Sequence, residues 1–291
     1  MKSSILIIVC ILSFASCIKE SLSDCTYQYQ VKLFVEEKRY AGEYPDGVEP
    51  INENLPFKAY VGDIYYTLQN VKTGTLITSR VFDVIDTDEK ELTLSLDDIS
   101  NGTYKLTVWG NVEDVDYLAA LPYTLHANEE ESTDIYLACR TFDFNDGEMQ
   151  DLSMGLRRLK GKLYLELADL PPHVDMVTKT ITNLHAVVSD DVAYSGETKV
   201  GKSFPLSGQQ ATVAIETTLA PTVAGKQSLL SLSFRNKETG VHLKVDPPLE
   251  VAIKKNEITY VKASYNPSED KLAIWLFIDG KWQFISKLDI K

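Results

Sequence analysis

The chain has 291 residues, of which 44% are hydrophobic, and a formal net charge of −13. This length suits one large domain or two ordinary ones, and the apolar fraction is sufficient for a buried core. Nucleic-acid binders use clustered Lys and Arg to neutralise phosphates, so an acidic chain without basic clusters is excluded from that class. The acidity is instead typical of an exposed, soluble extracellular region.

The first residues have the three-part layout of an export signal. Lys2 supplies a positive end, and an uninterrupted apolar run follows from Ile5 to Phe14. Ala15 and Ser16 are small residues of the kind found before a cleavage site. The run is shorter than the roughly 20 residues that a membrane-spanning helix needs. We therefore predict that residues 1–16 are a signal peptide; no later apolar run approaches spanning length.

Cys17 directly follows the two small residues, and this arrangement resembles a bacterial lipobox. In such a motif, signal peptidase II cuts before the cysteine, and the cysteine sulfur then carries a diacylglycerol. Phe14 departs from the Leu that is usual three positions before the cut. The match predicts lipidation of Cys17, with residues 17–24 as a polar tether. The alternative is an ordinary secretory signal with a chance cysteine.

The remaining cysteines predict a disulfide. Cys10 would leave with the signal peptide, and Cys17 would be acylated. Cys25 and Cys139 then remain as a pair in a compartment that permits disulfides. A bridge closing a loop of roughly 100 residues would stabilise the fold by about 4 to 5 kcal/mol in the chain-entropy model. The alternative is two separate thiols, because the sequence does not show their distance in space.

The mature chain begins with a predicted strand. In TYQYQVKLFVEE every second residue is apolar, which is the period of a half-buried strand and not of a helix. This apolar set comprises Tyr27, Tyr29, Val31, Leu33 and Val35. The following segment, residues 37–57, is rich in Pro, Gly and Glu. It predicts a long surface excursion that carries a short helix or has a role of its own.

Short strands separated by turns are predicted along the rest of the chain. Turn signals occur at Lys72-Thr73-Gly74, Asn101-Gly102 and Asp279-Gly280, the last a strong hairpin signal. No segment shows sustained helical periodicity. The strand candidates lie within 63–84, 91–96, 101–112, 132–141, 161–172, 177–188, 211–217, 227–236, 241–245, 257–265 and 271–288.

These strands form two series of similar length. The pattern predicts an all-β chain of two tandem antiparallel β-sandwiches, with a boundary near residues 143 to 156. We assign residues 25–148 to the N-terminal sandwich and residues 149–291 to the C-terminal one.

No motif for catalysis, a cofactor or a metal is found in the sequence. GxSxG, HExxH and a Gly-rich phosphate loop do not occur, and the four histidines are scattered singly. Residues 143–151, DFNDGEMQD, space their oxygens somewhat like a calcium loop, but the required glycine and glutamate are misplaced. We predict no catalytic residue, no metal site and no cofactor.

The tryptophans leave a glycan site open. Exposed rings of Trp109, Trp275 or Trp282 could stack on sugars, whereas aromatic residues on alternating strands more often form core or cross-strand pairs. A surface glycan-binding lipoprotein therefore stays an alternative function.

Several segments together resemble a known family. A lipobox cysteine is followed by IKESLSDC and an alternating strand, then by NGTYKLTVWGN, and later by LRRLKGKLYLELADLP. In this order the segments are similar to the FimB-type fimbrial anchoring lipoproteins of Bacteroidales. The resemblance spans nearly the whole chain, although each motif alone is loose.

The resemblance implies a fold, a location and a function. The fold would be two transthyretin-like sandwich domains, attached to the cell outer membrane through the lipid on Cys17. The protein would sit at the base of a fimbrium, anchor it and support its assembly or length control. Its partners would be fimbrial subunits, joined by strand pairing at an open sheet edge.

The runner-up function is a polymerising fimbrial subunit. Such subunits lose the lipid and the first strand when a protease cuts after a basic residue, and a donated strand then fills the vacated groove. Arg39 lies past the first predicted strand, where such a cut could fall. A bridge from Cys25 to Cys139 would favour the anchor, because it would retain the first strand even after a cut.

Overall fold

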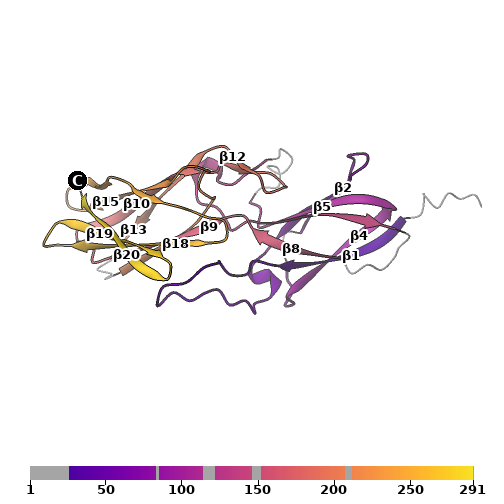
Figure 1. Cartoon of the computed structure of the whole chain (residues 1–291), viewed down its shortest axis with the longest axis horizontal. Helices are drawn as coiled ribbons and strands as arrows, with labels where there is room; N and C mark the ends of the chain where they lie inside the picture. The colour runs from indigo at the N-terminus through magenta and orange to yellow at the C-terminus, as the bar shows by residue number, and fades with distance from the viewer. Residues whose placement is uncertain (1–25, 83–84, 114–121, 146–151, 207–211, 291) are drawn as a thin grey trace, which may run out of the picture.

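The computed structural model describes residues 26–82, 85–113, 122–145, 152–206 and 212–290. They form two bodies of β-strands that lie end to end (Figure 1). The helical elements in this described part are two 3-10 helices, η2 (Phe57–Ala59) and η4 (Ala127–Glu129). The predicted all-β class with two tandem β-sandwiches is confirmed.

The first body is a seven-stranded sheet with the order β3-β2-β5-β7-β8-β1-β4, folded over its own core. Its strands are β1 (Thr26–Val35), β2 (Ile64–Asn70), β3 (Leu76–Phe82), β4 (Glu91–Ser100), β5 (Gly102–Gly110), β7 (Tyr136–Phe144) and β8 (Leu152–Arg158). Neighbours pair antiparallel except β1 with β8, which are parallel. Stacked aromatic rings fill one part of the core, with the Tyr29 and Phe144 ring centroids 4.3 Å apart.

The second body is a ten-stranded sheet with two layers. One layer has the order β14-β9-β18-β19-β20 and the other β13-β10-β15-β16, with β17 also pairing with β15. The two layers join where β16 meets β20. The strands are β9 (Gly161–Ala168), β10 (Val174–Leu184), β13 (Thr198–Pro205), β14 (Thr212–Leu219), β15 (Ser228–Asn236), β16 (His242–Asp246), β17 (Leu249–Val251), β18 (Ile258–Asn266), β19 (Lys271–Ile278) and β20 (Lys281–Ile290).

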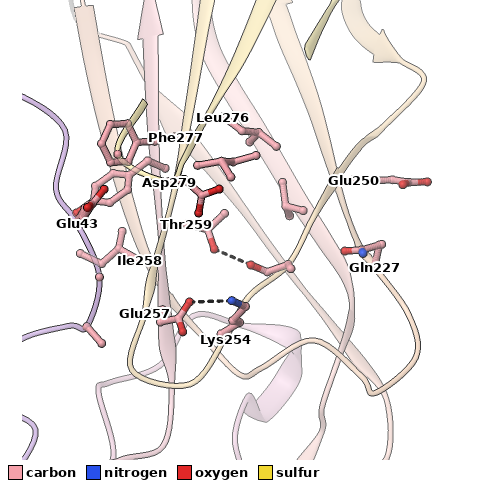
Figure 2. A pocket seen from close by; sticks show the side chains of 17 residues that line it. Glu43, Gln227, Glu250, Lys254, Glu257, Ile258, Thr259, Leu276, Phe277 and Asp279 are labelled. Atoms are coloured by element: carbon pink, nitrogen blue, oxygen red, sulfur yellow. Dashed lines mark hydrogen bonds and ion pairs between the residues drawn. The ribbon is translucent and has the colours of Figure 1, made fainter. Parts of the chain in front are cut away.

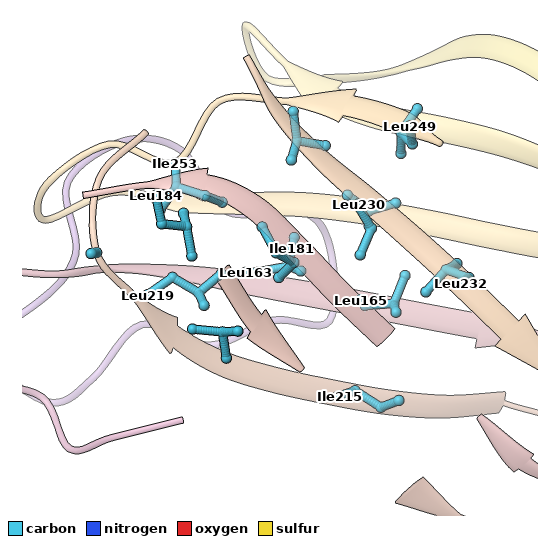
Figure 3. Close-up of a cluster of buried hydrophobic side chains, with 14 of the residues drawn as sticks. Leu163, Leu165, Ile181, Leu184, Ile215, Leu219, Leu230, Leu232, Leu249 and Ile253 are labelled. Carbon is cyan, nitrogen blue, oxygen red and sulfur yellow. The ribbon is translucent and has the colours of Figure 1, made fainter. Parts of the chain in front are cut away.

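The core of the second body consists mainly of branched aliphatic side chains from both layers. Figure 3 shows Leu163 and Leu165 of β9 facing Ile181 of β10 and Leu230 of β15. Alternate residues of each strand enter this core, because successive side chains in a strand point to opposite faces. The outward residues of β9, β18, β19 and β20 are therefore left on an open face of the sheet.

A segment of the first half of the chain connects the two bodies. β6 (Tyr123–Thr124) pairs with β11 (Val187–Val188), which also pairs with β12 (Tyr194–Ser195). Trp109 and Leu125 are buried in the same hydrophobic cluster as the leucines of the second body. The two bodies thus share a continuous apolar core.

Strand pairing sets the border between the bodies later than the sequence pattern did. β8 pairs with β1 and β7 and therefore belongs to the first sheet, although residues 149–291 were assigned to the second domain. The change of sheet falls at Leu159 and Lys160, between β8 and β9. Local periodicity identifies strands, but long-range pairing decides which sheet each one joins.

The predicted turns are present, whereas one long strand was missed. Asp279 and Gly280 have φ of 49° and 71°, which are the positive angles expected of a two-residue hairpin turn. The excursion after the first strand ends in η2, as its composition suggested. β13 was not predicted, because TKVGKSFP contains Gly, Pro and two Lys on an edge strand and shows little apolar alternation.

Candidate functional site: the first strand and the segment after it

β1 lies inside the first sheet and not at its edge. It pairs antiparallel with β4 and parallel with β8, so both of its backbone edges are hydrogen-bonded. Every second side chain enters the core, as the sequence predicted: Tyr29, Val31, Leu33 and Val35 are buried. Burial of a large apolar side chain contributes about 1.5 to 3 kcal/mol, so removal of β1 would cost the first body much of its stability.

The six residues after β1, Glu36–Ala41, are held in place and are called the latch segment below. The Glu36 carboxylate accepts two hydrogen bonds from the Arg157 guanidinium, each 2.8 Å long. This ion pair and its hydrogen bonds lower the pKa of Glu36 below its ordinary value. The next carboxylate, that of Glu37, accepts a 2.8 Å hydrogen bond from the backbone N–H of Arg158.

Arg158, the last residue of β8, is the centre of the contacts around the latch segment. Its side chain is 1% exposed, and its guanidinium donates to Asp134 at 2.5 Å. It also donates to the Asn256 side chain at 2.5 Å and to the Tyr136 hydroxyl at 2.6 Å. Burial lowers the pKa of Arg158, but attraction to Asp134 outweighs it and keeps the pKa above its ordinary value.

The second half of the latch segment reaches the second body. The Tyr40 ring is buried, and the Arg158 guanidinium lies 4.0 Å from its centroid. Ala41 donates a 2.7 Å backbone hydrogen bond to the carbonyl of Asn256. Tyr44, three residues further on, contacts the ring of Tyr260 in β18. The chain that leaves the first strand therefore bridges both bodies, as the indigo segment below them in Figure 1 shows.

Arg39 itself is accessible, although its neighbours are held. Its side chain is 54% exposed and lies 3.9 Å from Glu53. The Lys38 carbonyl on one side accepts a 3.5 Å hydrogen bond from Arg158, and Tyr40 on the other side is buried. A protease must accommodate several residues in extended form, so a cut after Arg39 requires the latch segment to open first.

The predicted cysteine sites lie partly outside the described residues. This holds for Cys17, for Cys25 and for the segments 1–16 and 17–24. Cys139 is exposed on β7, 3.6 Å from the Thr107 hydroxyl, and has no disulfide partner among the described residues.

The register of β1 bears on the predicted bridge. Cys139 lines the same groove as Phe34, near the far end of β1, whereas Thr26 at its start pairs with Ser100. These ends are about 26 Å apart at roughly 3.3 Å per residue, and bridged Cα atoms lie within about 7 Å. A bridge to Cys25 would thus require the start of β1 to leave β4. The bridge stays a prediction, and a non-reduced peptide map tests it.

A cleft of about 690 Å³ lies between the latch segment and the second body. Figure 2 shows Glu43, Phe277 and Asp279 on one side of this cleft and Gln227 and Glu250 on the other. Its one ion pair among the labelled residues joins Lys254 to Glu257 at 3.2 Å. The described residues of its lining include no histidine or cysteine that could act as a base or a nucleophile.

The three tryptophans have different environments. Trp109 is 2% exposed and belongs to the core shared by the two bodies. Trp275 and Trp282 lie on the hairpin of β19 and β20, in cross-strand pairs with Phe284 and Phe277 respectively. The glycan alternative thus reduces to the two tryptophans of this hairpin.

Sequence reasoning missed the buried charged residues at the junction. Lys160 is 0% exposed, donates to the carbonyl of Leu125 at 2.8 Å and also contacts the Ser132 hydroxyl. Burial lowers its pKa to about 7. Lys179 is buried against Glu131 at 2.5 Å, and burial lowers its pKa to about 8. Basic residues next to strands resemble surface residues in sequence, so no local signal marked them.

Two searches of the described residues concern metals and membranes. No group of three or more His, Cys, Asp or Glu in the described ranges is placed to hold a metal ion. Within those same ranges, no helix has the length and apolar character to cross a membrane.

No family model matches the chain, and no curated protein matches its sequence. Solved structures with the same fold are, however, similar over almost the whole chain. The fimbrial anchor protein Mfa2 from Porphyromonas gingivalis is 14% identical, with a TM-score of 0.51, and the match covers 90% of this chain and 100% of that one.

Two further structures come from Bacteroides thetaiotaomicron. A proposed adhesin is 10% identical with a TM-score of 0.55, covering 90% of this chain and 99% of that one. A proposed polysaccharide-binding protein is 10% identical with a TM-score of 0.56, covering 89% and 98%. At such identities the likeness shows the fold, which this chain shares with fimbrial and adhesin-like proteins of this bacterial group.

Proposed function

We propose that this protein is a lipid-anchored protein of the cell outer membrane that holds a fimbrium at the cell surface. The lipobox at Cys17 supports the membrane attachment. The fold shared with a fimbrial anchor protein supports the role at the base of a fimbrium. Partners would be fimbrial subunits, and no sequence or structural feature favours an enzyme.

The observation that carries this proposal is the retention of the first strand. β1 is hydrogen-bonded on both edges, and the latch segment behind it is tied to Arg157, Arg158 and Asn256. A subunit that joins a fibre by losing its first strand needs that strand to leave easily. An anchor needs the opposite, because its lipid reaches the fold only through the residues before β1.

The alternative is a fimbrial subunit released by a cut after Arg39. The exposure of the Arg39 side chain favours it, since an arginine-specific protease reads this side chain. The contacts on both sides of Arg39 oppose it, because they hold the residues that would have to enter the protease.

Strand pairing with fimbrial subunits requires an open sheet edge. The edge strands of the described sheets are β3 and β4 in the first body and β13 and β14 in the second. β3 has exposed apolar side chains, Leu76 and Ile77, whereas β4 has the acidic pair Asp97 and Asp98 that opposes edge pairing. We assign the partner strand to β3.

Mass spectrometry of the mature protein from its native membrane tests the anchor. We expect an acylated N-terminus at Cys17, with the chain intact through Arg39. An unlipidated product that begins at Tyr40 would contradict the anchor and support the fimbrial subunit. As a control, a Cys17→Ser variant should lose the lipid mass and leave the membrane fraction, while its described fold stays unchanged.

A further inference from the structure

An aromatic pair stands on the outer face of the second body, away from both cores. Leu272, Ile274 and Leu276 of β19 point inward, so Trp275 between them points outward. Trp275 pairs across the strands with Phe284 of β20, with ring centroids 5.9 Å apart and planes at 69°. The Phe284 side chain is 54% exposed. The pair thus presents ring surface to solvent that no residue of the described chain covers.

These rings line a groove of about 790 Å³. Its walls are stiff, because Pro171 and Pro172 border one side and Pro267 another. A volume of this size suits a small ligand, for which typical sites measure roughly 300 to 1,000 Å³. A protein partner would need about 800 Å² of surface on each side, which is far more than one such groove offers.

Polar groups stand around the rings. Asp169 accepts a 2.8 Å hydrogen bond from the Ser264 hydroxyl with one carboxylate oxygen, which leaves its other oxygen to accept. Asn266 uses its side-chain oxygen to accept from Ser268, so its NH₂ group is available to donate. The groove therefore offers both an acceptor and a donor beside the aromatic surface.

The charges of the groove nearly cancel. The Lys287 ammonium lies 2.7 and 2.5 Å from the two carboxylate oxygens of Glu269. Only Asp169 contributes a carboxylate among the lining residues without a cation beside it. An anionic ligand would meet Asp169, and a cationic one would gain a single carboxylate next to an ammonium that is already paired. The groove favours a neutral ligand.

We propose that this groove binds a neutral oligosaccharide. A sugar ring has an apolar C–H face and a hydroxyl edge, which match the exposed rings and the Asp169, Ser264 and Asn266 groups. The site is separate from β1 and the latch segment, so the protein would bind a glycan independently of its role in holding a fimbrium.

The test is binding of purified neutral hexasaccharides, laminarihexaose, xylohexaose and mannohexaose, with hexagalacturonate as the charged comparison. We expect isothermal titration to show binding of at least one neutral sugar. Phe284→Ala should weaken this binding at least tenfold, and Trp275→Ala should do the same. Because Phe284 is mostly exposed, its variant should keep the unfolding midpoint of the wild type.

Trp282→Ala is the matched control. Trp282 lies on the same hairpin and has an aromatic partner of its own, Phe277, but it does not line the groove. Its loss should change the affinity less than twofold. No binding of any neutral sugar at millimolar concentration, stronger binding of hexagalacturonate, or equal weakening by Trp282→Ala and Phe284→Ala would each overturn the proposal.

Discussion

Arg158 shows how one buried cation can connect distant parts of a chain. Its guanidinium contacts Asp134 and Tyr136 of the first body and Asn256 of the second, and its backbone holds Glu37. A buried charge is costly unless each donor is satisfied, and here five partner groups share that task. Its neighbour Arg157 makes a comparable ion pair with Glu36, but its side chain is 59% exposed.

Replacing these two arginines separates burial from charge. Arg158→Met should lower the free energy of unfolding by about 3 kcal/mol or more, because it leaves the Asp134 carboxylate without its partner. Arg157→Met should lower it by about 1 kcal/mol or less, because water screens an exposed pair. Urea denaturation measures both values.

The same variants report on the latch segment. Arg158→Met should also speed cleavage after Arg39 by an arginine-specific protease, which peptide masses at successive times would show. Equal losses of stability in the two variants, or no change in the cleavage rate, would mean that Arg158 does not control the latch segment.

At the scale of elements, the edge strands differ in how open they are. β3 has a bulge between Leu76 and Thr78, and from there its pairing with β2 is regular up to Phe82. Its outer backbone edge is unpaired, and Ile77 is 43% exposed. β4, at the opposite edge of the sheet, combines Asp97 with Asp98 in a left-handed conformation (φ 58°). Such charges and irregularities discourage pairing, so β3 is the more receptive edge.

A charge on β3 should block a partner strand. Ile77→Lys should weaken binding to fimbriae purified from the same cells at least tenfold, while the free energy of unfolding changes by about 0.5 kcal/mol or less. Thr93→Lys, on the exposed side of β4, serves as the control and should leave binding unchanged. Surface plasmon resonance measures both. If the β4 variant abolished binding instead, the partner strand would belong at that edge.

At the scale of the whole molecule, the junction makes two sandwiches one unit. His126 comes from the first half of the chain and is 3% exposed. Its Nε2 accepts a 2.9 Å hydrogen bond from the Ala220 N–H of the second body, and its Nδ1 lies 3.0 Å from the carbonyl of Glu130. The neutral ring fits this pair of contacts, because one nitrogen must accept while the other donates.

The pH dependence of stability follows from this geometry. Burial, together with the nearby Lys160 ammonium, lowers the pKa of His126 from 6.5 to about 3. The unfolded chain therefore binds a proton that the folded chain does not, and stability is lost as the pH falls from 6.5 towards 3. One such proton corresponds to about 1.4 kcal/mol per pH unit.

Replacing His126 should remove this part of the pH dependence. Between pH 6 and 4.5, the free energy of unfolding of His126→Gln should fall less steeply than that of the wild type, by up to about 1.4 kcal/mol per pH unit. Urea titrations at several pH values measure the slopes. Carboxylates such as Glu131 titrate in both proteins and cancel in the comparison. Parallel curves would mean that protonation of His126 does not weaken the junction.

Local pattern in the sequence determined the all-β class, the first strand and the hairpin at Asp279 and Gly280. Those features depend on the alternation of apolar residues and on turn chemistry, which act between near neighbours in the chain. It also placed Arg39 just beyond the first strand, and it predicted lipidation of Cys17 and the pair Cys25 and Cys139, which stay predictions.

Only the tertiary structure decided which strands share a sheet and which charged residues are buried. It joined β8 to β1, buried Arg158 and Lys160 at the junction, and separated Trp275 beside Phe284 from Trp109 in the core. These outcomes depend on contacts between residues far apart in sequence, where the burial of one side chain depends on elements that its local pattern does not describe. For this reason the latch segment and the aromatic groove are visible only in the folded chain.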